Sequence, residues 1–322
     1  MAPLPNLYFT RFVFEIKFIN GVSFPIFWGN MLKTEFLKAY RNLLCSENLD
    51  YCDDCNLQDS CKYYKMFEEI QQYPDYYYLK SIKKFPFPFI IHQPETSKRK
   101  FFANDRLELM ITIFGDYNLY FNDVRTALNN WGNDGFGREK AKFSITNIFV
   151  ADYKDKRTAA INKETDLLEQ NLPSVNIETL SKLNYAKYNK AVLDFNTPLQ
   201  LMNKGKVVTN NDEVNLKLLL EAIERRYLSC AYLFCDNKNL GNLSILDKSG
   251  DLPQIISNTL KFVETEKAKK NKKKLHDSSA MLGNLILFGD FSKIGIILHI
   301  GSFLGIGKSI LSGYGKYTII FK

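Results

Sequence analysis

Four cysteine thiols gather in a short stretch of this sequence, and together they have the chemistry of a metal site. They follow the spacing Cys-x6-Cys-x2-Cys-x5-Cys, at Cys45, Cys52, Cys55 and Cys61. Four thiolates form a closed shell around Zn²⁺, and the same set can hold an iron–sulfur cluster. Disulfides are rare in cytoplasmic proteins. We therefore expect a structural metal, with zinc as the simplest choice. An iron–sulfur cluster, four free thiols or two disulfides are the alternatives.

A glycine-rich stretch near the C-terminus is the second candidate. It holds two Gly-apolar-Gly units, Gly305-Ile-Gly307 and Gly313-Tyr-Gly315, separated by five residues. Glycine adopts positive φ at little cost and lets another backbone approach closely. Lys308 adds positive charge beside these amides. The pattern favours a loop folded against something flat or phosphorylated, and a glycine-rich hairpin without a ligand is the alternative.

The same stretch contains the Gly-Lys-Ser that ends a P-loop. A P-loop needs a further glycine at position 302, where this chain has Ser302. It also needs a long helix after the lysine, whereas the β-branched and aromatic residues of Lys316–Phe321 predict a strand. Nucleotide hydrolysis is therefore a poor explanation of this motif.

Charge and hydropathy narrow the class of protein. The net charge is +8, and six lysines within residues 267–274 form a run that attracts phosphate or is simply a solvated loop. The chain is 45% hydrophobic, enough to form cores. We find no run of 18 uncharged apolar residues and no signal-peptide pattern, so we expect a cytoplasmic protein without a membrane span.

The first half, residues 1–152, predicts one ferredoxin-like domain. Its pattern is strand, helix, strand, strand, helix, strand, an order also used by RNA-recognition modules. The cysteines fall in an insertion at 45–68. The expected elements are strands within Leu7–Ile19, Phe85–Ile91 (an edge strand), Arg106–Phe114 and Lys142–Val150, and helices at Phe27–Leu44 and Tyr117–Asn130.

The second half, residues 185–322, predicts a second ferredoxin-like domain after a polar linker at 153–184. The fold class is therefore α+β, with two tandem ferredoxin-like domains and a cysteine-rich insertion. We expect an apolar strand at Ile294–Ile300. The other expected elements are strands at Tyr188–Phe195 and Lys316–Phe321 and helices at Asn215–Phe234 and Leu252–Lys270.

These motifs resemble the RAMP superfamily of CRISPR-associated proteins. The paired Gly-apolar-Gly units near the end of a basic chain are its signature. A longer run resembles the C-terminal domain of the endoribonucleases that cut CRISPR precursor RNA within its repeats. The residues that carry the likeness are Gly283–Gly289, Leu298-His299, Gly307-Lys308 and Gly313–Tyr317, with shorter matches at Pro25–Lys33, Cys61–Glu68 and Thr197–Leu201.

The resemblance implies a cytoplasmic protein that binds CRISPR repeat RNA or guide RNA, with other CRISPR effector subunits as further partners. It implies cleavage by the RNA 2′-hydroxyl without a catalytic cofactor, leaving a 2′,3′-cyclic phosphate. Such cleavage needs a base, positive charge for the pentavalent phosphate, and an acid. The resemblance places glycine-loop and lysine residues against RNA. These RNA-binding candidates are Lys33, Arg41, Lys269, Lys270, Lys272, Lys273, Gly305, Gly307, Lys308, Gly313 and Gly315.

The catalytic assignment is where this chain departs from that family, which often uses a histidine on or just after the first helix. Here Lys38, Ala39 and Tyr40 stand at those positions. The catalytic candidates are therefore Lys38, Tyr40 and His276. Of the remaining histidines, we expect His92 at the surface and His299 either in the core or supporting a loop. The missing histidine keeps a second interpretation open, a non-catalytic RAMP subunit that holds guide RNA.

Overall fold

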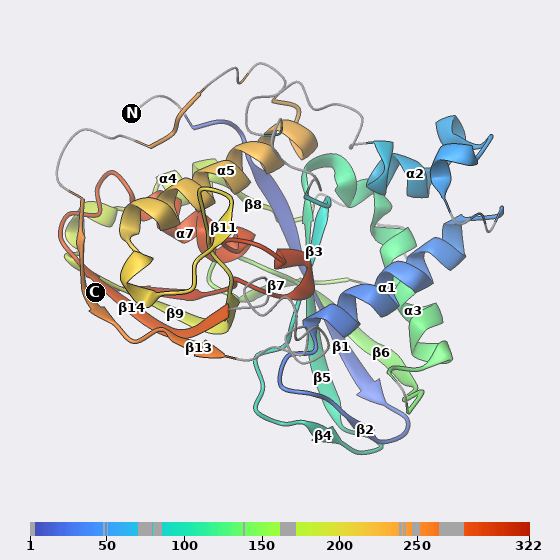
Figure 1. Ribbon diagram of the computed structural model, residues 1–322. Coiled ribbons are helices and arrows are strands. Elements are labelled where there is room, and N and C mark those ends of the chain that lie inside the picture. Colours follow the sequence, from blue (N-terminus) through green and yellow to red (C-terminus); the bar gives the residue numbers. More distant parts are fainter. Residues whose placement is uncertain are drawn as a thin grey trace. The chain divides into compact units, whose positions relative to one another are not determined.

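A computed structural model describes residues 4–47, 49, 51–69, 79, 86–137, 139–161, 172–237, 240, 243–246, 252–263 and 280–322. Within it the chain divides into two compact units. The N-terminal unit comprises Leu7–Val175 and Ser229–Asn242, and the C-terminal unit comprises Met1–Asn6, Asn176–Leu228 and Leu243–Lys322. Figure 1 shows the elements of both units.

The N-terminal unit is built on an antiparallel sheet with the strand order β3-β5-β1-β6-β7. Two helices of this unit, α1 and α3, pack against each other. The main elements are β1 (Tyr8–Phe18), α1 (Gly29–Leu44), β3 (Phe89–His92), β5 (Arg106–Phe114), α3 (Phe121–Asp134), β6 (Phe143–Ala151) and β7 (Arg157–Ala160). A short ladder pairs β2 (Val22–Ser23) with β4 (Lys100–Phe101), and the 3-10 helix η4 (Gly115–Tyr120) precedes α3.

Aromatic side chains fill the core of this unit. Phe12 and Phe14 of β1 both pack on Phe121 of α3. The ring centroid of Phe121 lies 4.2 Å from that of Phe12 and 5.9 Å from that of Phe14. Burial of this area supplies the main driving force for folding, and ring pairs add to it. Phe12, Phe14, Ile16 and Phe18 are all buried, as their alternation predicts.

The cysteine-rich insertion follows α1 directly. It contains two single-turn 3-10 helices, η1 (Cys52–Asp54) and η2 (Gln58–Ser60), and then the short helix α2 (Lys62–Phe67). Tyr64, Met66 and Phe67 of α2 are buried. The insertion is therefore anchored to the core at both of its ends.

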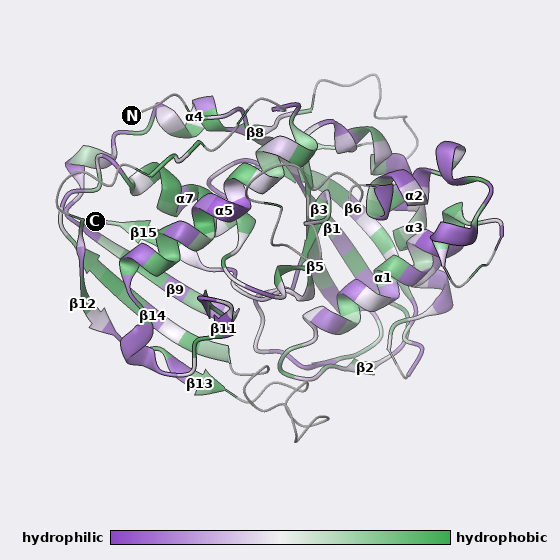
Figure 2. Ribbon diagram, turned by 45° about the horizontal axis from the view of Figure 1, so that its top comes forward, coloured by the Kyte–Doolittle hydropathy of each residue, from purple (hydrophilic) through white to green (hydrophobic). Residues whose placement is uncertain are grey.

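The C-terminal unit repeats the same plan. Its sheet has the order β12-β14-β9-β15, all antiparallel, with β13 also paired to β14. Figure 2 shows green, apolar segments along β9 and β14. Its elements are β9 (Lys190–Leu199), β10 (Met202–Asn203), β11 (Lys206–Val207), η7 (Asn211–Glu213), β12 (Gln254–Asn258), β13 (Lys261–Val263), β14 (Ala280–Phe288), α7 (Gly295–Leu304), η9 (Ile310–Ser312), β15 (Thr318–Phe321) and the part of α5 (Leu216–Phe234) that precedes Ser229.

The two units thus share one topology. Counting the main strands of each unit in chain order, both sheets run second, third, first, fourth, and this is the ferredoxin-like order. The predicted α+β fold class is confirmed. No helix among the described residues is long and apolar enough to cross a membrane.

Three predicted elements differ from the structure. The apolar run Ile294–Ile300 is not a strand, because Gly295–Leu304 forms the helix α7, buried on nearly every side. The described part of Leu252–Lys270 forms the strands β12 and β13 instead of a helix. The predicted linker 153–184 contains β7, which pairs with β6, then β8 (Val175–Asn176), α4 (Ile177–Ser181) and an asparagine cap at Asn176.

Candidate functional site

Helix α1 presents the first group of candidate residues, and Gln93 fixes its position. The Gln93 Oε1 atom accepts hydrogen bonds from the backbone amides of Trp28 and Gly29, at 2.9 and 3.0 Å. Its Nε2 atom donates to the carbonyl oxygen of Ile26 at 3.1 Å. A side chain that occupies orphan amides at a helix N-terminus stabilises the helix. Because Gln93 lies more than 60 residues away in the sequence, no local pattern could have revealed this cap.

The opposite faces of α1 have different roles. Leu32, Phe36, Ala39 and Tyr40 are buried, whereas Lys38 is exposed and Lys33 is half-buried. In Figure 2 the helix alternates between purple and green in the same way. Lys38 is therefore the catalytic candidate on α1 that a bound RNA can reach.

Tyr40 is a core residue. Its side chain has no exposed surface, and its ring packs edge-on against Phe67 with centroids 5.6 Å apart. Burial raises the pKa of its hydroxyl far above the ordinary value, and within the described part of the chain that hydroxyl has no hydrogen-bond partner. A buried phenol held in its neutral form cannot act as the base on RNA. The burial of Tyr40 is therefore inconsistent with its predicted catalytic role.

Arg41 belongs to the cysteine-rich segment. Its guanidinium donates a hydrogen bond to the carbonyl oxygen of Leu49 and lies 5.8 Å from the ring centroid of Tyr63. Desolvation lowers the pKa of Arg41, but the nearby Cys45, Tyr63 and Cys52 side chains outweigh it, so the pKa of Arg41 is raised. The predicted role of Arg41 in RNA binding stays a prediction, since these contacts give it a local structural role.

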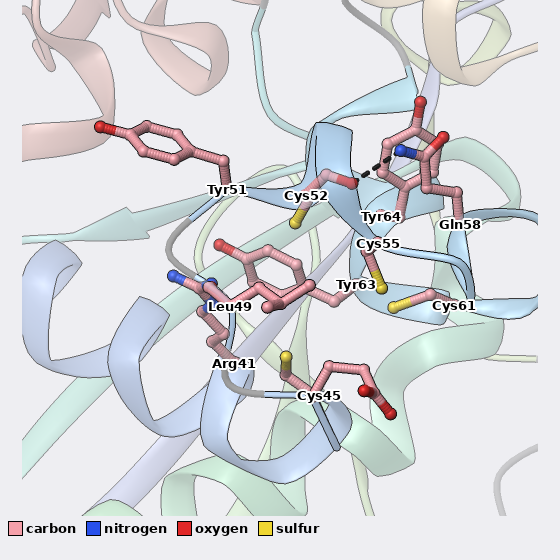
Figure 3. A pocket seen from close by; sticks show the side chains of 11 residues that line it. Arg41, Cys45, Leu49, Tyr51, Cys52, Cys55, Gln58, Cys61, Tyr63 and Tyr64 are labelled. Carbon is pink, nitrogen blue, oxygen red and sulfur yellow. Dashed lines mark hydrogen bonds between the residues drawn. The ribbon is translucent and has the colours of Figure 1, made fainter.

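The four clustered cysteines line a single pocket with Arg41, Tyr63 and Gln58. Figure 3 shows their sulfur atoms arranged around the Tyr63 side chain. All four are half-buried free thiols. Burial, and the nearby Glu68, raise the pKa of Cys52 against the opposing charge of Arg41. Among the described residues, no three cysteine, histidine, aspartate or glutamate side chains are gathered tightly enough to hold an ion as they stand.

The glycine loop, residues 305–315, adopts the conformation that its sequence predicts. All four signature glycines have positive φ, at +74° for Gly305, +87° for Gly307, +74° for Gly313 and +70° for Gly315. A Cβ atom on Gly307 would overlap the carbonyl oxygen of Gln200, and one on Gly315 would overlap that of Ile306. Close backbone packing within the C-terminal unit therefore explains Gly307 and Gly315.

Much of the loop backbone is already hydrogen-bonded. The amide of Lys308 donates to Gln200 O at 2.8 Å, and that of Gly315 donates to Pro198 O at 2.9 Å. The amide of Lys316 donates to the Thr197 hydroxyl at 2.9 Å. These amides are unavailable to a phosphate. At the tip of this loop, the side chain of Lys308 is exposed and stays a candidate for contact with RNA.

The structure also argues against a nucleotide-binding P-loop. Helix α7 precedes the Gly-Lys-Ser sequence, and the single turn η9 and strand β15 follow it. A P-loop has the reverse arrangement, with a strand before the loop and a helix after it.

Two of the three histidines lie in described parts of the chain. His299 is on α7, where its Nδ1 atom lies 2.9 Å from the Tyr185 hydroxyl and its ring stacks on Phe303. This is the supporting role that we expected, although on a helix. The prediction of a surface position for His92 is wrong, because this residue is buried and its Nε2 atom lies 2.8 Å from the Thr112 hydroxyl. His276 and the lysines of 267–274 lie outside the described residues, so their roles stay predictions.

Comparisons with known proteins establish the family and the fold. The family described as AF_1859_N, N-terminal domain, matches residues 5–174, more than half of the chain, and the chain belongs to this family. An uncharacterized protein of Archaeoglobus fulgidus is 24% identical over 307 residues, which cover 92% of each chain.

Among solved structures, a chain of a partial Cas6-RT-Cas1--Cas2 complex matches with a TM-score of 0.62 at 14% identity. The match covers all of the present chain but 47% of the other, so this chain spans about half the length of that relative. A chain from a Cas6 product complex matches with a TM-score of 0.52 at 14% identity, covering 97% of this chain and all of the other. The present chain therefore has the fold of Cas6 proteins.

Proposed function

We propose that this protein is a CRISPR-associated RNA-binding protein that cuts CRISPR repeat RNA without a catalytic metal. The observation that carries the proposal is the tandem ferredoxin-like architecture, shared over the whole chain with Cas6 proteins. The glycine-loop signature and the net charge of +8 are consistent with an RNA ligand.

In this proposal Lys38 supplies charge or proton transfer at the cleaved phosphate. Its side chain is exposed on a helix that Gln93 holds in place. A lysine ammonium stabilises developing negative charge, and a lysine of depressed pKa can transfer protons. Lys308, on the other unit, contacts RNA phosphate. The two contributions are tested separately, because each depends on its own unit.

A second function rests on a specific observation. With Tyr40 buried, α1 has neither a histidine nor an accessible tyrosine at the positions where the related endoribonucleases often place their catalytic histidine. This favours a non-catalytic subunit that holds guide RNA within a larger CRISPR assembly.

Incubation of the purified protein with labelled CRISPR repeat RNAs in EDTA separates these functions. Metal-independent cleavage supports the endoribonuclease. Tight binding without cleavage of any repeat selects the guide-holding subunit, and the absence of both binding and cleavage refutes the proposal.

The Lys38→Ala and Lys38→Arg variants then define the role of Lys38. Both should bind repeat RNA like the wild type. Arginine keeps the positive charge but does not deprotonate in proteins, so a role in charge stabilisation predicts recovery in Lys38→Arg and a role in proton transfer does not. Full cleavage by Lys38→Ala would remove Lys38 from the mechanism.

A further inference from the structure

The cysteine-rich segment carries chemistry that the proposed RNA function does not use. Four free thiols line one pocket, and none of them is in a disulfide. The other two cysteines of the chain, Cys230 and Cys235, are buried elsewhere. Half-buried thiols that share a pocket have no packing reason to be cysteine, so a ligand is the simpler explanation of their spacing.

The backbone between Cys52 and Cys55 forms a tight turn, the 3-10 helix η1. The amide of Cys55 donates to the carbonyl oxygen of Cys52 at 3.0 Å, which closes the turn. The amide of Leu57 donates to the Cys55 sulfur at 3.5 Å. Cys52 and Cys55 are therefore held on one turn.

A second turn ends at Cys61 and is joined to the first. The amide of Cys61 donates to Leu57 O at 2.9 Å and to Gln58 O at 3.2 Å. The Gln58 side-chain amide donates to the carbonyl oxygens of Cys52 and Asp53, at 2.7 and 2.9 Å. Three of the cysteines are therefore held on two cross-linked turns.

The remaining cysteine and the nearby arginine complete the electrostatics. Cys45 caps the C-terminus of α1, and its amide donates to Arg41 O at 2.8 Å. The Arg41 side chain lines the same pocket as the four cysteines. Four thiolates around a divalent ion leave a net charge of −2, and a guanidinium beside them offsets part of it.

We propose that Cys45, Cys52, Cys55 and Cys61 bind one zinc ion, with the Arg41 guanidinium in the same pocket. Zinc binding requires side-chain rotations that bring the four sulfurs to about 2.3 Å from the ion. A single zinc ion is sufficient to coordinate all four thiolates. It would tie the C-terminus of α1 to the start of α2, and the inference does not depend on RNA cleavage.

Metal binding by the full-length protein tests the proposal. Anaerobically purified protein should contain one zinc per chain. After removal of zinc by a chelator, Co²⁺ should restore one equivalent of metal with the visible absorption of a tetrathiolate site. Zinc should protect four thiols from alkylation, and the apoprotein should stay folded because Tyr64, Met66 and Phe67 are buried without it.

Three variants make the test specific. Cys55→Ser should lose the metal, whereas Cys230→Ala, which also removes one thiol, should keep it. Arg41→Gln should weaken zinc binding roughly tenfold, as expected for a nearby cation that offsets the negative charge of the site. Equal alkylation of the four thiols with and without zinc, or disulfides among them, would overturn the proposal, and a stoichiometric iron cluster would overturn the choice of zinc.

Discussion

One row of paired side chains across the sheet is charged or polar in the N-terminal unit, whereas the corresponding row of the C-terminal unit is aliphatic. In the first sheet, Glu15 of β1 lies between Glu108 of β5 and Asn147 of β6. In the second sheet, Val192 of β9 pairs with Ile286 of β14 on one side and with Ile320 of β15 on the other. All three of these side chains are aliphatic.

Strand β7 supplies an arginine that pairs with both carboxylates of this row. Arg157 of β7 donates to a Glu15 carboxylate oxygen at 2.9 Å and also contacts Glu108. The Asn147 amide donates to the second Glu15 oxygen at 2.6 Å. Arg106 also lies 3.9 Å from Glu15, so two arginines pair with the two carboxylates of this row. Units of one topology can therefore carry different chemistry at the same place in the sheet.

The units also differ in which of their connecting segments is long. The N-terminal unit has its cysteine segment after its first helix. The C-terminal unit has its glycine loop after its second helix, where the N-terminal unit turns within a few residues at Gly135. Backbone packing explains the glycine spacing in the C-terminal unit, but it does not explain the cysteine spacing in the N-terminal unit.

The largest expected effect concerns the glycine loop. In Gly315→Ala the new Cβ atom would overlap the carbonyl oxygen of Ile306, in addition to the strain of a φ of +70°. We expect a loss of at least about 2 kcal/mol in the free energy of unfolding, measured as a fall in Tm. Gly205→Ala is the control, because Gly205 has a φ of +81° with no atom within 4 Å of its Cβ position. It should cost about 1 kcal/mol, and equal losses would show that packing does not explain Gly315.

The next effect concerns the charged row. A hydrogen bond from Asn147 and the charge of Arg157 lower the pKa of Glu15, against a smaller opposing effect of burial. A lowered folded-state pKa stabilises the protein above the unfolded-state pKa of about 4.3, and this stability is lost as the pH falls through the folded-state value. Glu15→Gln should therefore lose about 1 kcal/mol at pH 7 and progressively less below about pH 4. A difference from wild type that is independent of pH would contradict the role of this charge.

A smaller effect is expected for Lys308 at the tip of the glycine loop. Lys308→Ala should weaken repeat-RNA binding roughly threefold and reduce the slope of log K against log salt by about 0.7. Tm should stay unchanged, since the side chain is exposed. Lys182→Ala is the control, because Lys182 is an exposed lysine that pairs with Glu178 at 2.8 Å. Equal salt slopes for Lys308→Ala and wild type would remove the loop tip from the RNA site.

The smallest effect is expected at Tyr40. The hydroxyl of this residue is buried without a partner among the described residues, so Tyr40→Phe should leave the free energy of unfolding unchanged or raise it by up to about 1 kcal/mol. RNA cleavage should also be unchanged. A variant of normal stability that had lost cleavage would restore Tyr40 as a catalytic residue.

Elements with a clear period were predictable from the sequence. Arg106–Phe114 forms β5 with the predicted bounds, and α1 ends at Leu44 as predicted. Helix α7 was not predictable from periodicity, because a helix buried on nearly all sides has no polar face. The strand β12 was missed because its sequence, Gln-Ile-Ile-Ser-Asn, does not alternate between polar and apolar residues, and none of its residues is fully buried.

The candidate site was predictable in part. The positive φ of the signature glycines follows from residue type, and the shared pocket of the four cysteines follows from their spacing. The burial of Tyr40 depends on Phe67 and the support of α1 depends on Gln93, and both partners are distant in sequence. Contacts of this kind are set by tertiary packing, which no local pattern encodes.

The chemistry of RNA cleavage is tested most directly with a repeat RNA that carries a single 2′-deoxynucleotide at the cleaved position. The protein should cut the unmodified RNA in EDTA and leave a 2′,3′-cyclic phosphate. It should bind the modified RNA with the same Kd but leave it uncut, because the attacking 2′-hydroxyl is missing. Cleavage of the modified RNA, or products that end in a 3′-hydroxyl, would contradict attack by the 2′-hydroxyl.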